Sequence, residues 1–272
     1  MNAGGWVWAV WALAVCGAAA GGAWGAEEEV VIVHFGDSTC ITSYLKPEQR
    51  VDALLNAQLK AHYKSQAIVN LNAGLDGDFI RQFLDGGRYE KAVTSKIPRI
   101  DVALIRYGQN DMKRFKPEEF KAHLIEFCDR LLKDYPGVTL VLESNTAIDT
   151  QHWGEKQTPR DFNDDANKKY NAYWEISRQV ARERGYPLVD VYERLKAEIL
   201  ADRWDLRIRN QGLSRQKFGD RVFDASKDAE MKDTPNWFFD SYPNPEGVKV
   251  VVDEEFKVLT KTWPERLPRA KR

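Results

Sequence analysis

Short apolar runs alternate with longer amphipathic segments along most of this chain. Five runs rich in Val, Ile and Leu predict strands, namely Val30–Phe35, Ala67–Leu71, Val102–Arg106, Val138–Leu142 and Leu188–Val191. Apolar residues at helical spacing predict helices over Pro47–Tyr63, Asp78–Phe83, Pro117–Lys133, Asp164–Arg184, Tyr192–Ala201 and Glu246–Leu259. The strands are apolar on both faces, as a parallel sheet covered by helices requires. The pattern therefore predicts an α/β fold, a three-layer α/β/α sandwich around a five-stranded parallel sheet.

Two stretches depart from this alternation. Residues 1–26 carry no charged side chain, and their apolar run ends in small residues before an acidic triplet, which is typical of a secretory signal peptide. An uncleaved membrane anchor is the alternative, because no basic residue precedes the run. We expect an exported, periplasmic or extracellular protein whose mature form has no membrane span, and N-terminal sequencing of exported material checks this expectation.

The second departure is an irregular insertion at about residues 202–237, inside a single domain that we expect to cover residues 27–272. This segment is rich in charge and glycine and has no helical or strand periodicity. Long structureless insertions are usually functional or disordered. Two interpretations follow, a solvated surface loop or a lid or wall of a substrate site.

Composition and cysteine spacing argue against nucleic-acid binding and against a zinc site. The formal net charge of the 272 residues is −1, so no basic footprint for nucleic acid is present. Two of the three cysteines, Cys40 and Cys128, follow the leader, and Cys128 is expected to be a small core residue rather than half of a disulfide. No Cys/His cluster has the spacing of a zinc site, and the sequence implies neither a metal nor an organic cofactor.

The first candidate motif, Gly36-Asp37-Ser38, comes directly after the first predicted strand. Ligands of open α/β sheets bind beyond the carboxyl ends of the strands, so Ser38 is well placed for a nucleophile. The alternative is that Asp37 and Ser38 only cap the next helix, because Asp and Ser are preferred at that position.

Two more motifs follow the second and third predicted strands, Asn72-x-Gly74-x-x-Gly77 and Gly108-x-Asn110-Asp111. A tetrahedral oxyanion needs preorganised N–H donors, which backbone amides and an asparagine side chain supply. A glycine lets the backbone approach a ligand closely. Each motif alone is ordinary turn chemistry, but three in order after successive strands indicate one site at a common edge of the sheet.

Together with Pro243-Asn244-x-x-Gly247 near the C-terminus, these blocks resemble the SGNH (GDSL-like) hydrolases. The resemblance spans residues 35 to 247. It implies a flavodoxin-like α/β/α fold and the hydrolysis of carboxylic or carbohydrate esters. It also implies Ser38 as the nucleophile, and an oxyanion hole formed by the Ser38 N–H, the Gly74 N–H and the Asn110 side chain.

The last block departs from the pattern of the family, which has Asp-x-x-His directly before Pro-Asn. Tyr242 stands at the position of that histidine and Phe239 at the position of that aspartate, whereas Asp240 comes one residue late. A serine hydroxyl is a weak nucleophile without an adjacent base, and a tyrosine with an ordinary pKa of about 10 is a poor base at neutral pH.

Two other residues are candidates for the base. Asp240 can serve as a carboxylate base or be a turn residue ahead of Pro243, and His152 follows the fourth strand in a segment that starts at the active-site edge. His34 lies inside the first strand and is expected to be packed against helices. Glu143 ends the fourth strand, where we expect a solvated carboxylate rather than part of the rim of the site.

The sequence thus predicts an ester hydrolase that deacylates a carbohydrate or another small ester through Ser38, with a non-standard or weakened base. Its partner would be that small-molecule or carbohydrate ester. The alternative is an inactive relative that binds carbohydrate or acyl groups on an aromatic platform, formed by Trp153, Trp204, Trp237, Phe238 and Tyr242.

Overall fold

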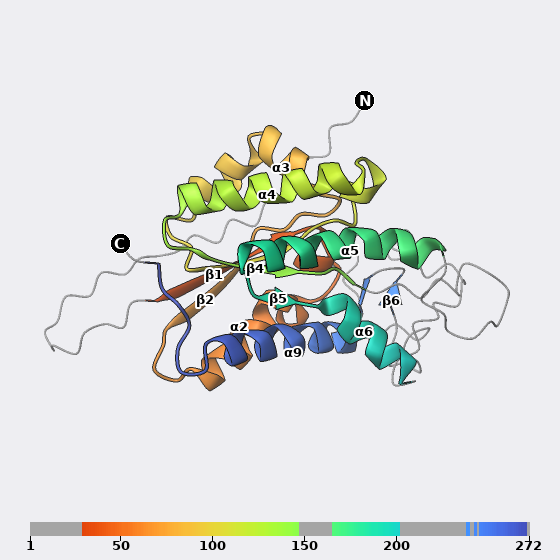
Figure 1. Cartoon of the computed structure of the whole chain (residues 1–272). Coiled ribbons are helices and arrows are strands. Elements are labelled where there is room, and N and C mark those ends of the chain that lie inside the picture. Colours follow the sequence, from red (N-terminus) through yellow and green to blue (C-terminus); the bar gives the residue numbers. More distant parts are fainter. Residues whose placement is uncertain (1–28, 147–164, 202–237, 240–241, 244, 271–272) are drawn as a thin grey trace, which may run out of the picture.

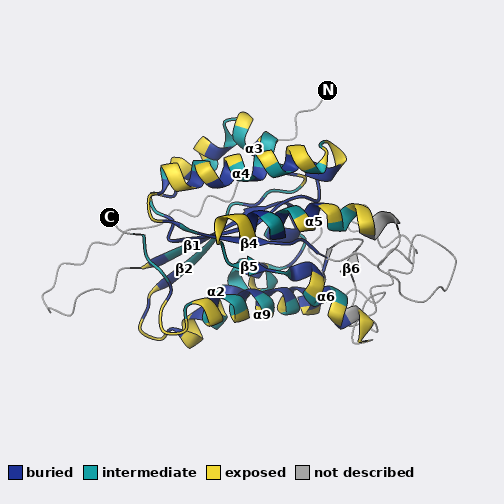
Figure 2. Cartoon of the chain, in the orientation of Figure 1, coloured by how far each residue is buried: buried dark blue, intermediate teal, exposed yellow. Residues whose placement is uncertain are grey.

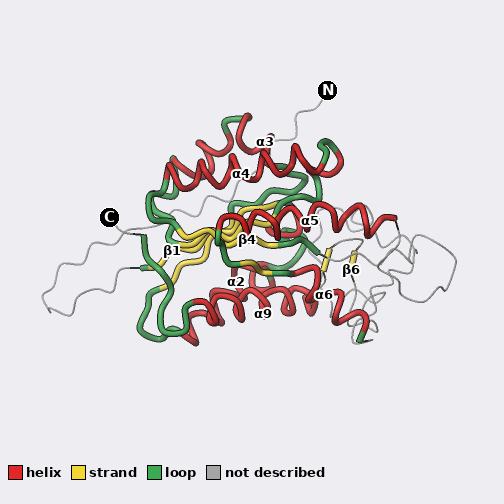
Figure 3. Tube along the Cα trace, viewed as in Figure 1, coloured by secondary structure: helices red, strands yellow, loops and turns green. Residues whose placement is uncertain are grey.

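A five-stranded parallel sheet lies at the centre of the protein (Figure 3). The computed structural model describes residues 29–146, 165–201, 238–239, 242–243 and 245–270. The strands are β1 (Val30–Gly36), β2 (Ile68–Asn72), β3 (Val102–Arg106), β4 (Thr139–Glu143) and β5 (Leu188–Val189). Their order is β2-β1-β3-β4-β5, and every pairing is parallel. The predicted leader, the insertion at 202–237, His152 and Asp240 lie outside the described residues.

Helices cover both faces of the sheet (Figure 1). On one face lie α3 (Ile80–Asp85), α4 (Pro117–Asp134) and α5 (Asp165–Arg184). On the other lie α2 (Val51–His62), α6 (Val191–Leu200) and α9 (Pro245–Thr262). The three-layer α/β/α sandwich predicted from the alternating pattern is confirmed.

Several short elements were not predicted. They are the one-turn helix α1 (Ser38–Ile41), the 3-10 helices η1 (Pro47–Gln49) and η3 (Asp111–Lys113), the π-helix η2 (Glu90–Thr94), and the antiparallel pair β6 (Phe238–Phe239) and β7 (Tyr242–Pro243). An element of one turn or two residues is too short to show a hydrophobic period. Strand β5 is shorter than predicted because α6 already begins at Val191.

Buried residues fill the interface between the sheet and the helices α3 and α4 (Figure 2), and several of them are aromatic. Phe35 of β1 packs edge-on against Phe127 of α4, with ring centroids 5.4 Å apart, and Phe127 packs edge-on against Phe83 of α3 at 5.6 Å. Such arrangements are preferred by aromatic pairs. Cys128 is buried as a free thiol, as expected, and so is Cys40. This packing fixes β1, whose carboxyl end carries Ser38.

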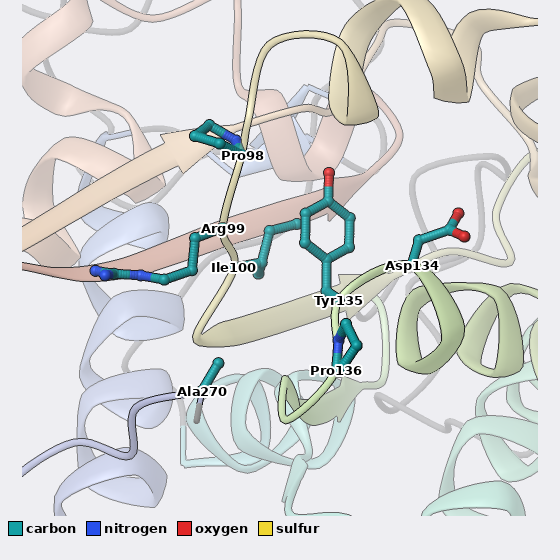
Figure 4. Close-up of a pocket in the computed structure, with 7 residues that line it drawn as sticks. All are labelled: Pro98, Arg99, Ile100, Asp134, Tyr135, Pro136 and Ala270. Carbon is teal, nitrogen blue, oxygen red and sulfur yellow. The ribbon is translucent and has the colours of Figure 1, made fainter. Parts of the chain in front are cut away.

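A cavity of about 510 Å³ opens at the amino ends of β3 and β4 (Figure 4). Ser38 follows the carboxyl end of β1, at the opposite edge of this parallel sheet. It is lined by Pro98, Arg99, Ile100, Asp134, Tyr135, Pro136 and Ala270. None of these is a predicted site residue. Among the residues with described placement, no helix is both long and apolar enough to cross a membrane.

Candidate active site

The turn after β1 carries the Gly-Asp-Ser motif and leads directly into the one-turn helix α1. A Cβ at Gly36 would lie 2.5 Å from the Arg106 carbonyl oxygen and 2.5 Å from Cys40 Cβ, so only glycine lets the chain enter α1 here. Asp37 is the N-cap of α1, and its Oδ1 accepts from the Thr39 N–H at 2.9 Å. Ser38 is therefore the first residue of the helix, buried at the carboxyl edge of the sheet. The cap is confirmed for Asp37, while the nucleophilic role of Ser38 stays a prediction.

Asn145, the second residue after β4, contacts this turn, and sequence reasoning missed it. Its Nδ2 donates to Asp37 Oδ2 at 3.3 Å, and its Oδ1 lies 2.8 Å from the Thr39 hydroxyl. Burial raises the pKa of Asp37 above its ordinary value, against the opposing hydrogen bonds from Thr39. The available signal was the polar run Ser144-Asn145-Thr146 after a buried strand.

Gly74 lies against the turn that carries Ser38. A Cβ there would lie 3.2 Å from both the Gly36 carbonyl oxygen and Ile41 Cβ, so a larger residue would press on that turn. The Gly74 N–H, the second predicted oxyanion donor, donates to Asn72 Oδ1 at 3.0 Å. It can serve an oxyanion only by being shared with, or released from, this bond.

Asn110 is fixed at both ends of its side-chain amide. Its Nδ2 donates to the Asp78 carbonyl oxygen at 3.1 Å, and its Oδ1 accepts from Lys113 Nζ at 3.1 Å. Because one partner is an acceptor and the other a donor, the two bonds together define which way the amide points. A primary amide carries two N–H groups, and the bond to Asp78 uses one of them.

Asp111 ties the loop after β3 to the start of α3. Its Oδ1 accepts from the Ile80 N–H and its Oδ2 from the Gly108 N–H, both at 3.1 Å. Burial raises the pKa of Asp111 to about 7. Gly108 has φ +122°, and a Cβ there would lie 2.7 Å from the ring of Trp174, so no other residue fits this turn. The loops after β1, β2 and β3 therefore interlock at one edge of the sheet.

A buried ion cluster of Arg106, Glu143 and Glu255 contacts the Ser38 turn through Arg106. Arg106, the last residue of β3, donates through Nε to Glu143 Oε2 at 2.6 Å and through Nη2 to Glu255 Oε1 on α9. Its Nη1 donates to the Thr39 carbonyl oxygen at 3.3 Å. All three charged side chains are buried. The expectation that Glu143 is a solvated strand-end carboxylate is wrong, because Arg106 on the neighbouring strand draws it inward.

His34 is packed in the interior, as expected. It is fully buried on β1, between the paired residues Asn72 of β2 and Leu104 of β3. Burial, and then the charge of Arg106, lower the pKa of His34 to about 3, so its imidazole is neutral at physiological pH.

The last predicted block lies beside α1. The Tyr44 hydroxyl, just after α1, donates to the Pro243 carbonyl oxygen at 2.7 Å, and β7 contacts both α1 and α9. Asp240 and His152 fall outside the described residues, so a role as base stays a prediction for each. Among the residues that the structure places, no group of three or more His, Cys, Asp or Glu side chains is arranged to hold a metal ion.

Solved structures with this fold include several esterases. An acetyl xylan esterase, AlAXEase, is 20% identical with a TM-score of 0.58, over 84% of this chain and 98% of its own. An acetylxylan esterase from Geobacillus stearothermophilus is 16% identical with a TM-score of 0.56, over 84% and 93% of the two chains. An alpha/beta hydrolase enzyme from the metagenome of Lake Arreo, Spain, is 18% identical with a TM-score of 0.56, over 84% and 94%. At these identities the likeness shows the fold alone.

The sequence comparisons identify a family rather than a particular relative. No curated protein matches the chain. The sequence profile of the GDSL-like Lipase/Acylhydrolase family matches residues 34–250, a stretch that contains all four motif blocks, from the Ser38 turn to the start of α9. This protein therefore belongs to the GDSL-like lipase/acylhydrolase family.

Proposed function

We propose that this protein is an ester hydrolase that removes an acyl group from a carbohydrate or another small ester, with Ser38 as its nucleophile. The observation that carries the proposal is the interlocking of the loops after β1, β2 and β3, which brings the Ser38 turn, Gly74 and Asn110 to one edge of the sheet. Family membership supports hydrolase chemistry. Acetyl esters are the first substrates to test, since acetylxylan esterases share the fold.

In the proposed reaction, the Ser38 hydroxyl attacks the ester carbonyl carbon while a base takes its proton. The oxyanion that forms is stabilised by the Ser38 N–H and the Asn110 Nδ2, with the Gly74 N–H as a third donor once it is shared by Asn72. The alcohol leaves with the proton, and water then hydrolyses the acyl-enzyme. No metal or organic cofactor enters these steps.

Replacing Asn110 by alanine tests the oxyanion site. The variant loses one preorganised donor, so we expect kcat for an activated acetyl ester to fall by about 10²- to 10³-fold. The control is Asn56→Ala, which removes an asparagine from α2, outside the site, and should leave kcat unchanged. Equal rates for wild type and Asn110→Ala would remove Asn110 from the mechanism.

Two substitutions identify the base. Asp240→Asn and His152→Ala are compared at neutral pH, and the one that removes the base should lower kcat by about 10²- to 10⁴-fold, the usual value of general-base assistance. The other variant serves as its control. If both variants retain full activity, neither Asp240 nor His152 is the base.

The replacement of the family's histidine by Tyr242 favours a second function, binding of carbohydrate or acyl groups without hydrolysis. A serine-reactive fluorophosphonate separates the two. Covalent labelling of Ser38, located by peptide mass spectrometry, supports the hydrolase. Absence of labelling and of hydrolysis, together with measurable binding of an acetylated xylo-oligosaccharide, would establish the binding protein instead.

A further inference from the structure

We propose that Lys113 is a positioning residue of the active site, which orients and polarises the Asn110 side-chain amide for oxyanion binding through its hydrogen bond to Asn110 Oδ1. This inference rests on the proposed function, because it assigns Asn110 to the oxyanion site. Its structural basis is a separate observation, the contact between the Lys113 ammonium and the amide oxygen.

The path of the chain explains the contact. Lys113 ends the 3-10 helix η3, which starts directly after Asn110, and the Lys113 N–H donates to the Asn110 carbonyl oxygen at 3.3 Å. This turn folds the long Lys113 side chain back over Asn110, where Nζ lies 3.1 Å from Oδ1. Lys113 is exposed, whereas Asn110 is buried at 8% exposure. A solvated cation therefore covers the outer end of a buried amide.

Within the described part of the chain, this ammonium makes no ion pair with a carboxylate, so Asn110 Oδ1 is its hydrogen-bond partner there. Burial raises the pKa of Asp37 in the Ser38 turn, and the Lys113 charge lowers it slightly, after the larger influences of Thr39 and Arg106. Lys113 thus places positive charge at the edge where the oxyanion would form.

Two consequences follow for the amide. The bond at Oδ1 and the bond from Nδ2 to the Asp78 carbonyl oxygen together prevent the amide from turning over, so the remaining N–H direction is fixed. A cationic donor at Oδ1 also draws electron density from the amide and makes its N–H groups stronger donors, as in any chain of polarised hydrogen bonds.

Arg114 provides the matched comparison. It is the next residue, it is also exposed, and its Nη1 contacts the backbone carbonyl oxygen of Asn110 at 3.3 Å rather than the side chain. Its guanidinium lies over the Phe79 ring, 4.2 Å from the centroid. Removing either residue takes one positive charge from the same rim, but of the two it is Lys113 that contacts the side-chain amide of Asn110.

The experiment measures kcat and KM for an activated acetyl ester in Lys113→Met, Lys113→Arg and Arg114→Met, each in the wild-type and the Asn110→Ala background. Lys113→Met should lower kcat by about 10- to 10²-fold with KM nearly unchanged, because a misplaced donor costs less than a missing one. Lys113→Arg keeps a cationic donor and should retain most of the activity, as should Arg114→Met. In the Asn110→Ala background, Lys113→Met should have no further effect.

A second measurement does not depend on activity. The side-chain amide signals of Asn110 are assigned in a ¹⁵N–¹H spectrum as the pair that disappears in Asn110→Ala. They should shift in Lys113→Met and stay in place in Arg114→Met. Three results would each overturn the inference. The Asn110 signals could stay unchanged in Lys113→Met, kcat could fall equally in Lys113→Met and Arg114→Met, or Lys113→Met could lower kcat as much in the Asn110→Ala background as in the wild type.

The two proposals fail differently. A wild type without Ser38-dependent hydrolysis overturns the proposed function and, with it, the catalytic part of this inference, and the amide signals then still decide whether Lys113 holds Asn110. An active wild type whose rate is indifferent to Lys113→Met overturns the positioning role and leaves the proposed function intact.

Discussion

Replacing Ser38 by alanine is expected to reduce ester hydrolysis to the background rate, a loss of roughly 10⁴-fold or more. The change removes the attacking oxygen itself, and serine hydrolases that lose their nucleophile retain only the contribution of substrate binding and the oxyanion hole. The backbone should tolerate the change, since Ser38 is the first residue of α1 and Asp37, not Ser38, caps that helix. The measurement is the initial rate with an activated acetyl ester, at enzyme concentrations high enough to detect residual turnover.

The control for this variant is Ser95→Ala, which removes an exposed hydroxyl that donates to the Lys91 carbonyl oxygen. Ser95 caps the C-terminal end of η2 and belongs to none of the loops that carry the predicted site residues, so this variant should keep the wild-type rate. A Ser38→Ala protein that is folded and as active as wild type would exclude Ser38 as the nucleophile and contradict the proposed reaction.

The sheet could be predicted because each strand shows its own apolar run. All five predicted strands are present. Val102–Arg106 matches β3 at both ends, and the ends of the other four differ by at most two residues, since hydrophobic runs do not record where a hydrogen-bond ladder stops. The positions of the Ser38 turn and of the Gly74 and Asn110 loops were predictable for a related reason. Parallel strands end at a common edge, so polar motifs that follow neighbouring strands meet there.

Several of the partners that hold these motifs could not be predicted, because they come from distant parts of the chain. The sequence around Glu143 predicts a solvated carboxylate, because no neighbouring residue shows that Arg106 and Glu255 pair with it in the interior. In the sequence Asn145 is an ordinary loop residue, and its hydrogen bond to Asp37 is seen only in the folded structure. The engagement of the Gly74 N–H by Asn72 is local, but it depends on the conformation of the turn rather than on residue types.

The Arg106 cluster also predicts the largest change in stability. Arg106→Met leaves Glu143 and Glu255 buried without their cation, and breaking a buried ion pair in this way typically costs about 3–5 kcal/mol of unfolding free energy. The control, Arg184→Met, breaks an exposed pair with Asp129 and should cost less than about 1 kcal/mol. Urea unfolding at matched pH measures both changes.

The pH dependence of the Arg106→Met variant follows from the pKa values of its two carboxyls. In the wild type, burial raises the pKa of Glu143 and raises the pKa of Glu255 well above its ordinary value. The Arg106 charge lowers both pKa values, so its loss in the variant raises them further. The folded variant then binds more protons than the unfolded chain at every pH above the unfolded value of about 4.3 and below the raised values. Its stability therefore falls as pH rises through this window, and its deficit against wild type should be larger at pH 8 than at pH 5.

A triple variant tests whether unpaired charge is the cause of that loss. Arg106→Met combined with Glu143→Leu and Glu255→Leu replaces the whole cluster with apolar side chains, and such replacements of buried ion networks are often neutral or stabilising. We expect the triple variant to recover most of the stability lost in Arg106→Met and to lose its dependence on pH. Because Arg106 also donates to the Thr39 carbonyl oxygen, the rate of ester hydrolysis should not recover with stability. A triple variant as unstable as Arg106→Met would instead show that the shape of the cluster, and not its charge balance, holds the sheet to α9.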